Sequence, residues 1–202
     1  MGASGGGAGT ALAGRRVLLC VTGGIAAYKA VELARRLGDA GAQIQVAMTE
    51  AATRFVGAQT FQAVTHRAVR TSLWDASAEA AMGHLELARW AQQVVVAPAT
   101  ANTIAKLAHG FADDLVATLC LATDAPLAIA PAMNHRMWLH PATRANVETL
   151  RSRGVRVIGP DDGPLAEGES GPGRLAEPEA IVAALAAFDA GQAAAGRGAG
   201  HA

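Results

Sequence analysis

Five short apolar runs alternate with segments of helical periodicity, and this alternation constrains the fold more than any other feature of the chain. Each run is continuous or nearly continuous in apolar residues, which is typical of strands covered on both faces. Strand followed by helix, repeated along the chain, predicts a parallel sheet with right-handed crossovers and helices on both sides. We therefore expect a doubly wound, three-layer α/β/α Rossmann-like domain with a mainly parallel sheet. The expected strands are 17–21, 44–48, 94–97, 127–130 and 155–159, and the expected helices are 26–41, 100–110, 113–123 and 140–154.

The folded domain is expected to span residues 15–188 and to lie between two tails. Residues 1–14 show neither the basic start and apolar core of a signal peptide nor a myristoylation pattern, which predicts a flexible N-terminal tail. Residues 189–202 are rich in Gly and Ala without apolar periodicity, which predicts a disordered C-terminal tail. The chain has 202 residues, 51% of them hydrophobic, which is enough for one domain with a substantial core.

Charge and cysteine content argue against several classes of partner and site. The 17 basic and 17 acidic residues cancel and no Lys/Arg cluster stands out, so a nucleic-acid partner is not expected. No stretch approaches the roughly 20 apolar residues of a membrane span. The only cysteines, Cys20 and Cys120, lie in apolar stretches, which indicates core thiols in a reducing cytoplasm. No His or Cys spacing fits a metal site.

Glycine and hydroxyl residues follow the first two predicted strands, at the sheet edge where doubly wound domains bind ligands. In TGGIAAYK, Gly23 and Gly24 let backbone N–H groups turn toward an anion at the start of a helix. The same turn is equally an ordinary connection, and it matches neither G-x-G-x-x-G nor a P-loop, which disfavours NAD and ATP. After the second strand, Thr49 either caps a helix or hydrogen-bonds a phosphate.

The next two predicted strands and one helix start carry further polar candidates. The PATANT segment, residues 98–103, offers hydroxyl and amide groups to a phosphate or a polar ring edge, and equally an N-cap at Thr100 or Asn102. Core packing accounts for the methionines and the tryptophan of PAMNHRMW but not for the amide of Asn134. His84, at the entry of an apolar helix face in GHLELARWA, is either an acid/base group or a structural histidine.

The order and the sequences of these motifs resemble those of the homo-oligomeric flavin-containing cysteine decarboxylases, and within that family those of the enzymes that act on phosphopantothenoylcysteine. The resemblance runs from about Arg16 to Ala187 and is carried by GGIAAYK, GHLELARWA, APATANTIAKLAHGFADDL and PAMNHRMW. The last of these fits the family's P-x-M-N-x-x-M-W signature. Bacterial bifunctional relatives add a domain that ligates cysteine to phosphopantothenate, so we expect a stand-alone decarboxylase or a severed half.

The resemblance implies FMN as the cofactor, with its phosphate at Gly23-Gly24 and Thr49 and its ring system beside Phe55 and residues 100–103. It also implies a trimer or an assembly of trimers in which His84 reaches a neighbour's site. The implied residues are His84, Asn134 and Glu167 for catalysis, Asn134 and Met137 for the substrate, and Gly23, Gly24, Ile25, Ala26, Thr49, Phe55, Thr100, Ala101, Asn102 and Thr103 for the cofactor.

The implied chemistry explains why a decarboxylase needs a flavin. An ordinary N-acylated cysteine carboxylate has no electron sink for the pair left behind by CO₂. Removal of hydride from the carbon that bears the thiol gives a thioaldehyde, whose C=S accepts that pair as CO₂ leaves to give an enethiolate. In this scheme His84 acts as acid/base and Asn134 hydrogen-bonds the carboxylate.

The resemblance is incomplete in GPLAEGESGPGR, residues 163–174, which we expect to form a lid. The resemblance implies that in the pantothenate-pathway members this loop reads A-C-G before G-x-G-R, and that its cysteine helps return the enethiol to a saturated thiol. Here Glu167 stands at the position of that cysteine. Three hypotheses follow. In the first, Glu167 or Glu169 replaces the thiol as a protonated donor. In the second, the reaction stops at the enethiol, as in peptidyl-cysteine decarboxylases, and in the third the chain is a non-catalytic flavin-binding regulator. The alternative, equally supported by the sequence, is that both glutamates are solvated charges on the loop. The close match of the other motifs favours the first hypothesis, and the presence of His84 and Asn134 disfavours the third.

Overall fold

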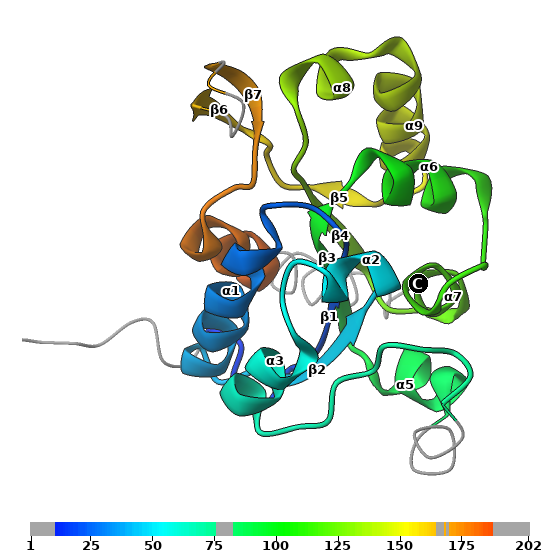
Figure 1. Ribbon diagram of the computed structural model, residues 1–202. Coiled ribbons are helices and arrows are strands. Elements are labelled where there is room, and N and C mark those ends of the chain that lie inside the picture. Colours follow the sequence, from blue (N-terminus) through cyan, green and yellow to red (C-terminus); the bar gives the residue numbers. More distant parts are fainter. Residues whose placement is uncertain (1–10, 76–82, 165–167, 169, 188–202) are drawn as a thin grey trace, which may run out of the picture.

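A five-stranded parallel sheet forms the middle layer of the protein, with helices on both faces (Figure 1). The computed structural model describes residues 11–75, 83–164, 168 and 170–187. The elements in chain order are β1 (Arg16–Val21), α1 (Ala27–Asp39), β2 (Gln43–Met48), α2 (Glu50–Thr53), α3 (Ala58–Thr65), α5 (His84–Trp90), β3 (Gln93–Ala99), α6 (Ala101–His109), α7 (Leu115–Ala122), β4 (Leu127–Pro131), α8 (His135–Leu139), α9 (Pro141–Ser152), β5 (Arg156–Val157), β6 (Asp161–Pro164) and β7 (Ser170–Arg174). Residues 178–187 form a last helix.

The strand order is β2-β1-β3-β4-β5, and every neighbouring pair is parallel. The chain passes from β1 to β2 through α1 on one face of the sheet and from β3 to β4 through α6 and α7 on the other. The direction of winding therefore reverses between β1 and β3, which is the topological switch point of a doubly wound sheet. The predicted fold class is confirmed.

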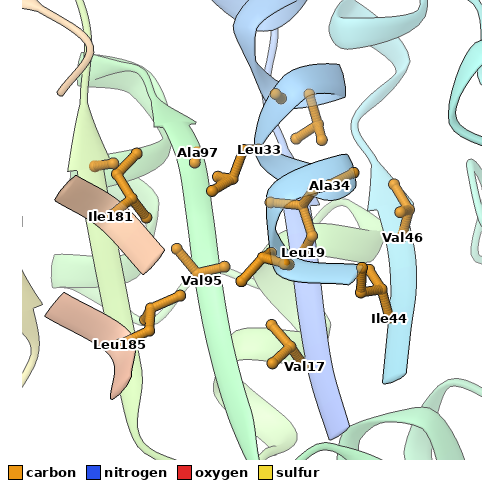
Figure 2. Close-up of a cluster of buried hydrophobic side chains, with 14 of the residues drawn as sticks. Val17, Leu19, Leu33, Ala34, Ile44, Val46, Val95, Ala97, Ile181 and Leu185 are labelled. Carbon is orange, nitrogen blue, oxygen red and sulfur yellow. The ribbon is translucent and has the colours of Figure 1, made fainter. Parts of the chain in front are cut away.

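Alternate residues of each central strand enter different layers of the core. Leu19 of β1 and Val95 of β3 face α1 and the last helix, and Figure 2 shows Leu33 of α1 with Ile181 and Leu185 of that helix packed over them. The opposite face of the same strands packs against α5, α6, α7 and α9. Each fully buried aliphatic side chain contributes roughly 1.5–3 kcal/mol, so a one-residue slip of a strand would be costly on both faces.

All five strands begin and end within two residues of their predicted bounds, but the last strand is much shorter than expected. Strand β5 keeps only two residues of the expected 155–159. Gly159 has a φ of 78°, which takes the chain out of extended conformation, and Pro160 has no N–H with which to continue the ladder. The chain then forms β6 and β7, an antiparallel pair where the sequence predicted only a lid loop.

Packing begins before the predicted domain start at residue 15. Leu12 is 2% exposed, and its N–H donates to the carbonyl of Ala40 at 3.0 Å. Residues 1–10 and 188–202, which hold most of the two predicted tails, lie outside the described residues.

The thiols of Cys20 and Cys120 are free and lie in the layer of α7, as predicted for core cysteines. A hydrogen bond with Cys120, together with burial, raises the pKa of the Cys20 thiol well above its ordinary value. Within the described residues, no helix has both the length and the apolar character needed to cross a membrane. The same residues contain no group of three His, Cys, Asp or Glu side chains that could hold a metal ion.

Candidate active site

A cleft of about 1480 Å³ opens at the carboxyl ends of the parallel strands, beside the switch point between β1 and β3. Small-molecule sites commonly measure about 300–1,000 Å³, so this cleft has room for a cofactor and a substrate together. All the residues predicted to bind the cofactor line it: Gly23, Gly24, Ile25, Ala26, Thr49, Phe55, Thr100, Ala101, Asn102 and Thr103. Asn134 and Met137 line the same cleft.

The turn after β1 presents backbone donors to the cleft. Among the described residues, no group accepts a hydrogen bond from the N–H of Gly23, Gly24 or Ile25. A Cβ on Gly23 would lie 2.8 Å from the carbonyl carbon of Ala51, so only glycine lets the turn pack this closely against α2. Three donors at the start of α1, where the helix dipole is positive, form a suitable site for an anion such as a phosphate.

Thr22 joins the two central strands beneath this turn. Its hydroxyl donates to the carbonyl of Pro98 at 2.6 Å and accepts from the N–H of Thr100 at 3.3 Å. The side chain is buried, so water does not compete for these hydrogen bonds. They fix the end of β1 against the end of β3 and thereby set the spacing of the glycine turn and α6. Sequence analysis did not single out Thr22.

Three polar residues predicted for the site are also helix caps. The Thr49 hydroxyl accepts from the N–H of Ala52 at 3.2 Å, and the Thr100 hydroxyl accepts from the N–H of Thr103 at 3.3 Å. Asn134 caps α8. The capping interpretation is therefore confirmed for Thr49 and Thr100, whereas Asn102 lies inside α6. A residue can both cap a helix and line the cleft, because the N-termini of these helices face the cleft and a cap residue lies at the N-terminus.

When the side-chain oxygen of Asn134 caps α8, its amide nitrogen is left to donate to a ligand. Its Oδ1 accepts from the N–H of Arg136 at 2.8 Å, which holds the side chain in place. No described group accepts from its amide nitrogen, which lines the cleft as a donor. An amide donor oriented by its own helix is suited to bind a carboxylate.

Apolar side chains are exposed where they face the cleft. Ile25, Phe55 and Met137 are 65%, 49% and 49% exposed, although residues of this kind are usually buried. Met137 therefore does not pack in the core as the sequence suggested, whereas Trp138 beside it is buried. Exposed apolar groups that line a concave surface indicate a ligand or a partner that covers them.

Lys106 and Asp114 are cleft residues that sequence analysis missed. The carboxylate of Asp114 uses both oxygens: Oδ1 accepts from the N–H of Ala117 and so caps α7, and Oδ2 accepts from Nζ of Lys106 at 2.7 Å. Nζ of Lys106 also donates to Asp113 at 2.9 Å, which lowers the pKa of that carboxyl. Desolvation opposes the charge on Lys106, but hydrogen bonds to Asp114 and Asp113 raise its pKa overall. The i,i+3 spacing of Lys106 from Thr103 could have predicted its position.

Of the other two predicted catalytic residues, one does not line this cleft and one is not among the described residues. His84 begins α5, which packs against α7 away from α8 and β7 (Figure 1), and it does not line the cleft of its own chain. The Glu86 carboxylate at the same helix start accepts from the N–H of Gly83 at 3.3 Å. Glu167, like Glu169, lies outside the described residues.

Comparison with known proteins assigns this architecture to a family. Residues 8–189 match the sequence model described as Flavoprotein. The chain belongs to the flavoprotein family. Its resemblance to flavin-containing cysteine decarboxylases, inferred from the motifs, is thereby confirmed.

One curated flavoprotein relative is the coenzyme A biosynthesis bifunctional protein CoaBC of Escherichia coli strain K12. It is 55% identical over 171 residues, which are 85% of this chain and 42% of the relative. The chain therefore spans less than half the length of that protein.

Two solved flavoprotein structures resemble the fold. A PPC decarboxylase mutant complexed with pantothenoylaminoethenethiol has a TM-score of 0.77 and 32% identity, covering 87% of this chain and 98% of the other. The FMN-dependent cysteine decarboxylase SpaF has a TM-score of 0.72 and 35% identity, covering 87% and 99%.

Proposed function

We propose that this chain catalyses the FMN-dependent decarboxylation of 4′-phosphopantothenoylcysteine to 4′-phosphopantetheine in coenzyme A biosynthesis. The observation that carries the proposal is that the residues suited to hold a flavin and the amide suited to hold a carboxylate line one cleft. The relative named for coenzyme A biosynthesis is 55% identical over 85% of the chain, which supports the pathway. Because the chain spans 42% of that relative, the proposal is limited to decarboxylation.

The cleft fits FMN in both charge and shape. The free N–H groups of Gly23 and Gly24, with the hydroxyl of Thr49, would hold the phosphate, and Phe55 and residues 100–103 would lie along the ring system. When bound, FMN supplies the redox step that removes hydride from the carbon bearing the substrate thiol. The protein's own contribution is to position the substrate and to exclude water.

Asn134 would bind the carboxylate that is lost as CO₂. Its oxygen is engaged by the N–H of Arg136, so its amide nitrogen would donate to the substrate. Met137, one turn further along α8, would form an apolar wall that limits the access of water to the reacting carbon. A carboxylate held by one oriented donor in a pocket that excludes water has little hydration to lose when CO₂ leaves and its charge passes to the sulfur of the enethiolate.

His84 would complete the site from a neighbouring subunit. In its own chain it does not line the cleft, and the next residue, Leu85, is an exposed apolar side chain that would suit a subunit contact. We infer a cytoplasmic homo-oligomer, a trimer or an assembly of trimers, in which one subunit provides Asn134 and another provides the acid/base His84.

Glu167 would be the proton donor in the half-reaction that returns the enethiolate to a saturated thiol. This role requires a carboxyl kept protonated by the closed lid. The second candidate is oxidative decarboxylation of a C-terminal peptidyl cysteine that ends at the enethiol. It is favoured by one specific observation, the presence of Glu167 at the position where the resemblance to the pathway enzymes leads us to expect a cysteine.

Mass spectrometry of the product made under anaerobic conditions separates the two candidates. Purified FMN-loaded protein is mixed with excess phosphopantothenoylcysteine while the flavin spectrum is followed. Loss of CO₂ alone, over many turnovers and with oxidised flavin at the end, is expected. Loss of CO₂ and two hydrogens, with the flavin bleached after one turnover, would contradict the redox-neutral reaction and support the oxidative one.

Subunit mixing tests the shared site. We expect His84→Gln and Asn134→Ala each to lower turnover by about 10²–10⁴-fold. When the two variants are co-expressed with different tags and purified as mixed oligomers, some sites regain an intact pair, so part of the activity should return. Mixed oligomers as inactive as either variant alone would show that His84 does not act in a neighbour's site.

A further inference from the structure

The charges that line the cleft are not balanced evenly along its length. The charged residues among the described lining are Lys29, Glu50, Arg54, Lys106, Asp114 and Arg174. Lys106 is paired with two aspartates, and Arg54 is paired with Glu50 on an exposed surface. In the described part of the cleft, positive charge exceeds negative charge only around Lys29 and Arg174.

Lys29 and Arg174 share a single carboxylate oxygen. Oε1 of Glu177 lies 3.0 Å from Nζ of Lys29 and 3.1 Å from Nη2 of Arg174. The other acidic side chains nearby are already engaged, because Glu32 and Glu179 both pair with Arg36. At this end of the cleft, Lys29 and Arg174 are therefore held by one shared carboxylate oxygen, whereas Lys106 has two aspartates of its own.

The position of both cations is set by the fold. The guanidinium of Arg174, on β7, packs over the backbone of Gly163 on β6, where a Cβ would lie 2.6 Å from Nη1. Lys29 lies in the first turn of α1, whose dipole also favours an anion. Their side chains are 36% and 20% exposed, so each charge is partly shielded from water yet open to the cleft.

Strand β7 also connects this cation pair to the carboxylate end of the site. The carbonyl of Gly173 accepts from the N–H of Met133 at 2.9 Å, next to Asn134. The residue after Gly173 is Arg174. A ligand held at Asn134 could therefore run along β7 and place its far end beside Arg174 and Lys29.

We propose that Lys29 and Arg174 bind the terminal phosphate monoester of the substrate and so select phosphorylated over dephosphorylated ligands. The inference rests on the proposed function. Phosphate accepts several charge-assisted hydrogen bonds, arginine offers a planar fork to it, and lysine adds a compact charge. The flavin phosphate would be held by the N–H groups of Gly23 and Gly24, so the two phosphates would have separate sets of donors.

The test measures binding of 4′-phosphopantothenate and pantothenate to the FMN-loaded protein by calorimetry. The unaltered protein should prefer the phosphorylated ligand, and Lys29→Met and Arg174→Gln should each weaken its binding by about tenfold to hundredfold. Pantothenate and FMN affinities should not change. Arg151→Gln is the control, because it removes an exposed, ion-paired cation on α9 that does not line the cleft; it should leave all affinities unchanged.

Glu177→Gln separates ligand binding from a structural tie between α1 and β7. It removes the competing carboxylate, so affinity for the phosphorylated ligand should rise a few-fold, whereas loss of a structural tie would lower it for both ligands. Equal losses for both ligands, a fall in FMN affinity, or no phosphate preference in the unaltered protein would overturn the proposal. Phosphate preference without turnover of phosphopantothenoylcysteine would instead contradict the proposed function alone.

Discussion

Two regions face the same cleft but are held by different forces. The strand-end cradle, defined as residues 23–26, Thr49 and residues 100–103, follows strands whose side chains are almost all buried; every residue of β3 is buried. In the hairpin, defined as β6 and β7, no residue of β6 is buried, and backbone pairing holds the strands together. The positions of the cradle residues are therefore fixed by the packed core, whereas the hairpin is held by backbone pairing between β6 and β7 and by a few contacts at its base.

The base of the hairpin is attached at two points. Gly173 accepts a hydrogen bond from Met133, and Leu175, directly after β7, is buried. Residues beyond this base can change without disturbing the core. This difference predicts that mutations in the hairpin alter chemistry, whereas mutations in the cradle alter stability and flavin binding.

Glu167→Ala should have the largest effect, and the effect should be on chemistry alone. If Glu167 donates the proton that completes the reductive half, turnover should fall by about hundredfold or more, with the flavin left reduced after one cycle. FMN affinity and Tm should stay unchanged if the residue acts only in the chemical step. The measurement is anaerobic product analysis with the flavin spectrum recorded.

Two further variants test whether Glu167 is the proton donor. Glu167→Cys should restore cycling because it introduces the thiol expected from the family, and Glu169→Ala serves as the matched control. Unchanged reductive turnover in Glu167→Ala would exclude Glu167 as the donor and make Glu169 or water the candidate.

Gly23→Ala should have the next largest effect, on stability and flavin binding together. The added Cβ would meet the backbone of α2 at 2.8 Å, which cannot move without disturbing the cradle. Overpacking of this kind costs about 1–3 kcal/mol, or a fall in Tm of roughly 2–10 °C for a domain of this size. Thermal melting and FMN titration measure both effects.

Gly24→Ala is the matched control for Gly23→Ala. Its Cβ would lie 3.5 Å from Cγ2 of Thr100, an ordinary van der Waals contact, so Tm should change little. If the two alanine variants melted alike, tight packing of the turn against α2 would not be what requires glycine at position 23.

Thr100→Val should have an intermediate effect in the cradle. Valine keeps the shape but loses the oxygen that accepts from the N–H of Thr103, which costs about 1 kcal/mol, or roughly 2–4 °C in Tm. Thr100→Ser keeps the cap and should retain most of the stability. A loss in Thr100→Ser with none in Thr100→Val would mean that the methyl group, rather than the cap, stabilises α6.

Gly171→Ala should have the smallest effect. Its Cβ would lie 3.2 Å from Cβ of His135, so α8 or the hairpin must shift by only a few tenths of an ångström. We expect a change in Tm of about 2 °C or less. A loss as large as that of Gly23→Ala would contradict the distinction between a fixed cradle and an independent hairpin.

The local pattern of apolar and polar residues was sufficient to predict much of the fold and most of the residues that line the cleft. Continuous apolar runs predicted the sheet because strands covered on both faces cannot carry polar residues, and parallel strands bring their carboxyl ends to one edge. The residues after each strand were therefore expected to meet, and Thr49, Thr100 and Asn134 do line one cleft. The sequence did not predict the hairpin, because Gly, Pro and Asp at its strands are the residues that normally indicate turns.

The sequence by itself determined which residues stand at the strand ends, because apolar periodicity and the connectivity of a doubly wound sheet leave little choice. Only the tertiary structure decided which charges face each other. Lys29 and Glu177 are separated by 148 positions, and Lys106 meets Asp114 across two helices. It also decided that His84 stands outside the cleft of its own chain. Such pairings depend on how helices pack over the sheet, and surface charges carry no periodic signal that would reveal their partners.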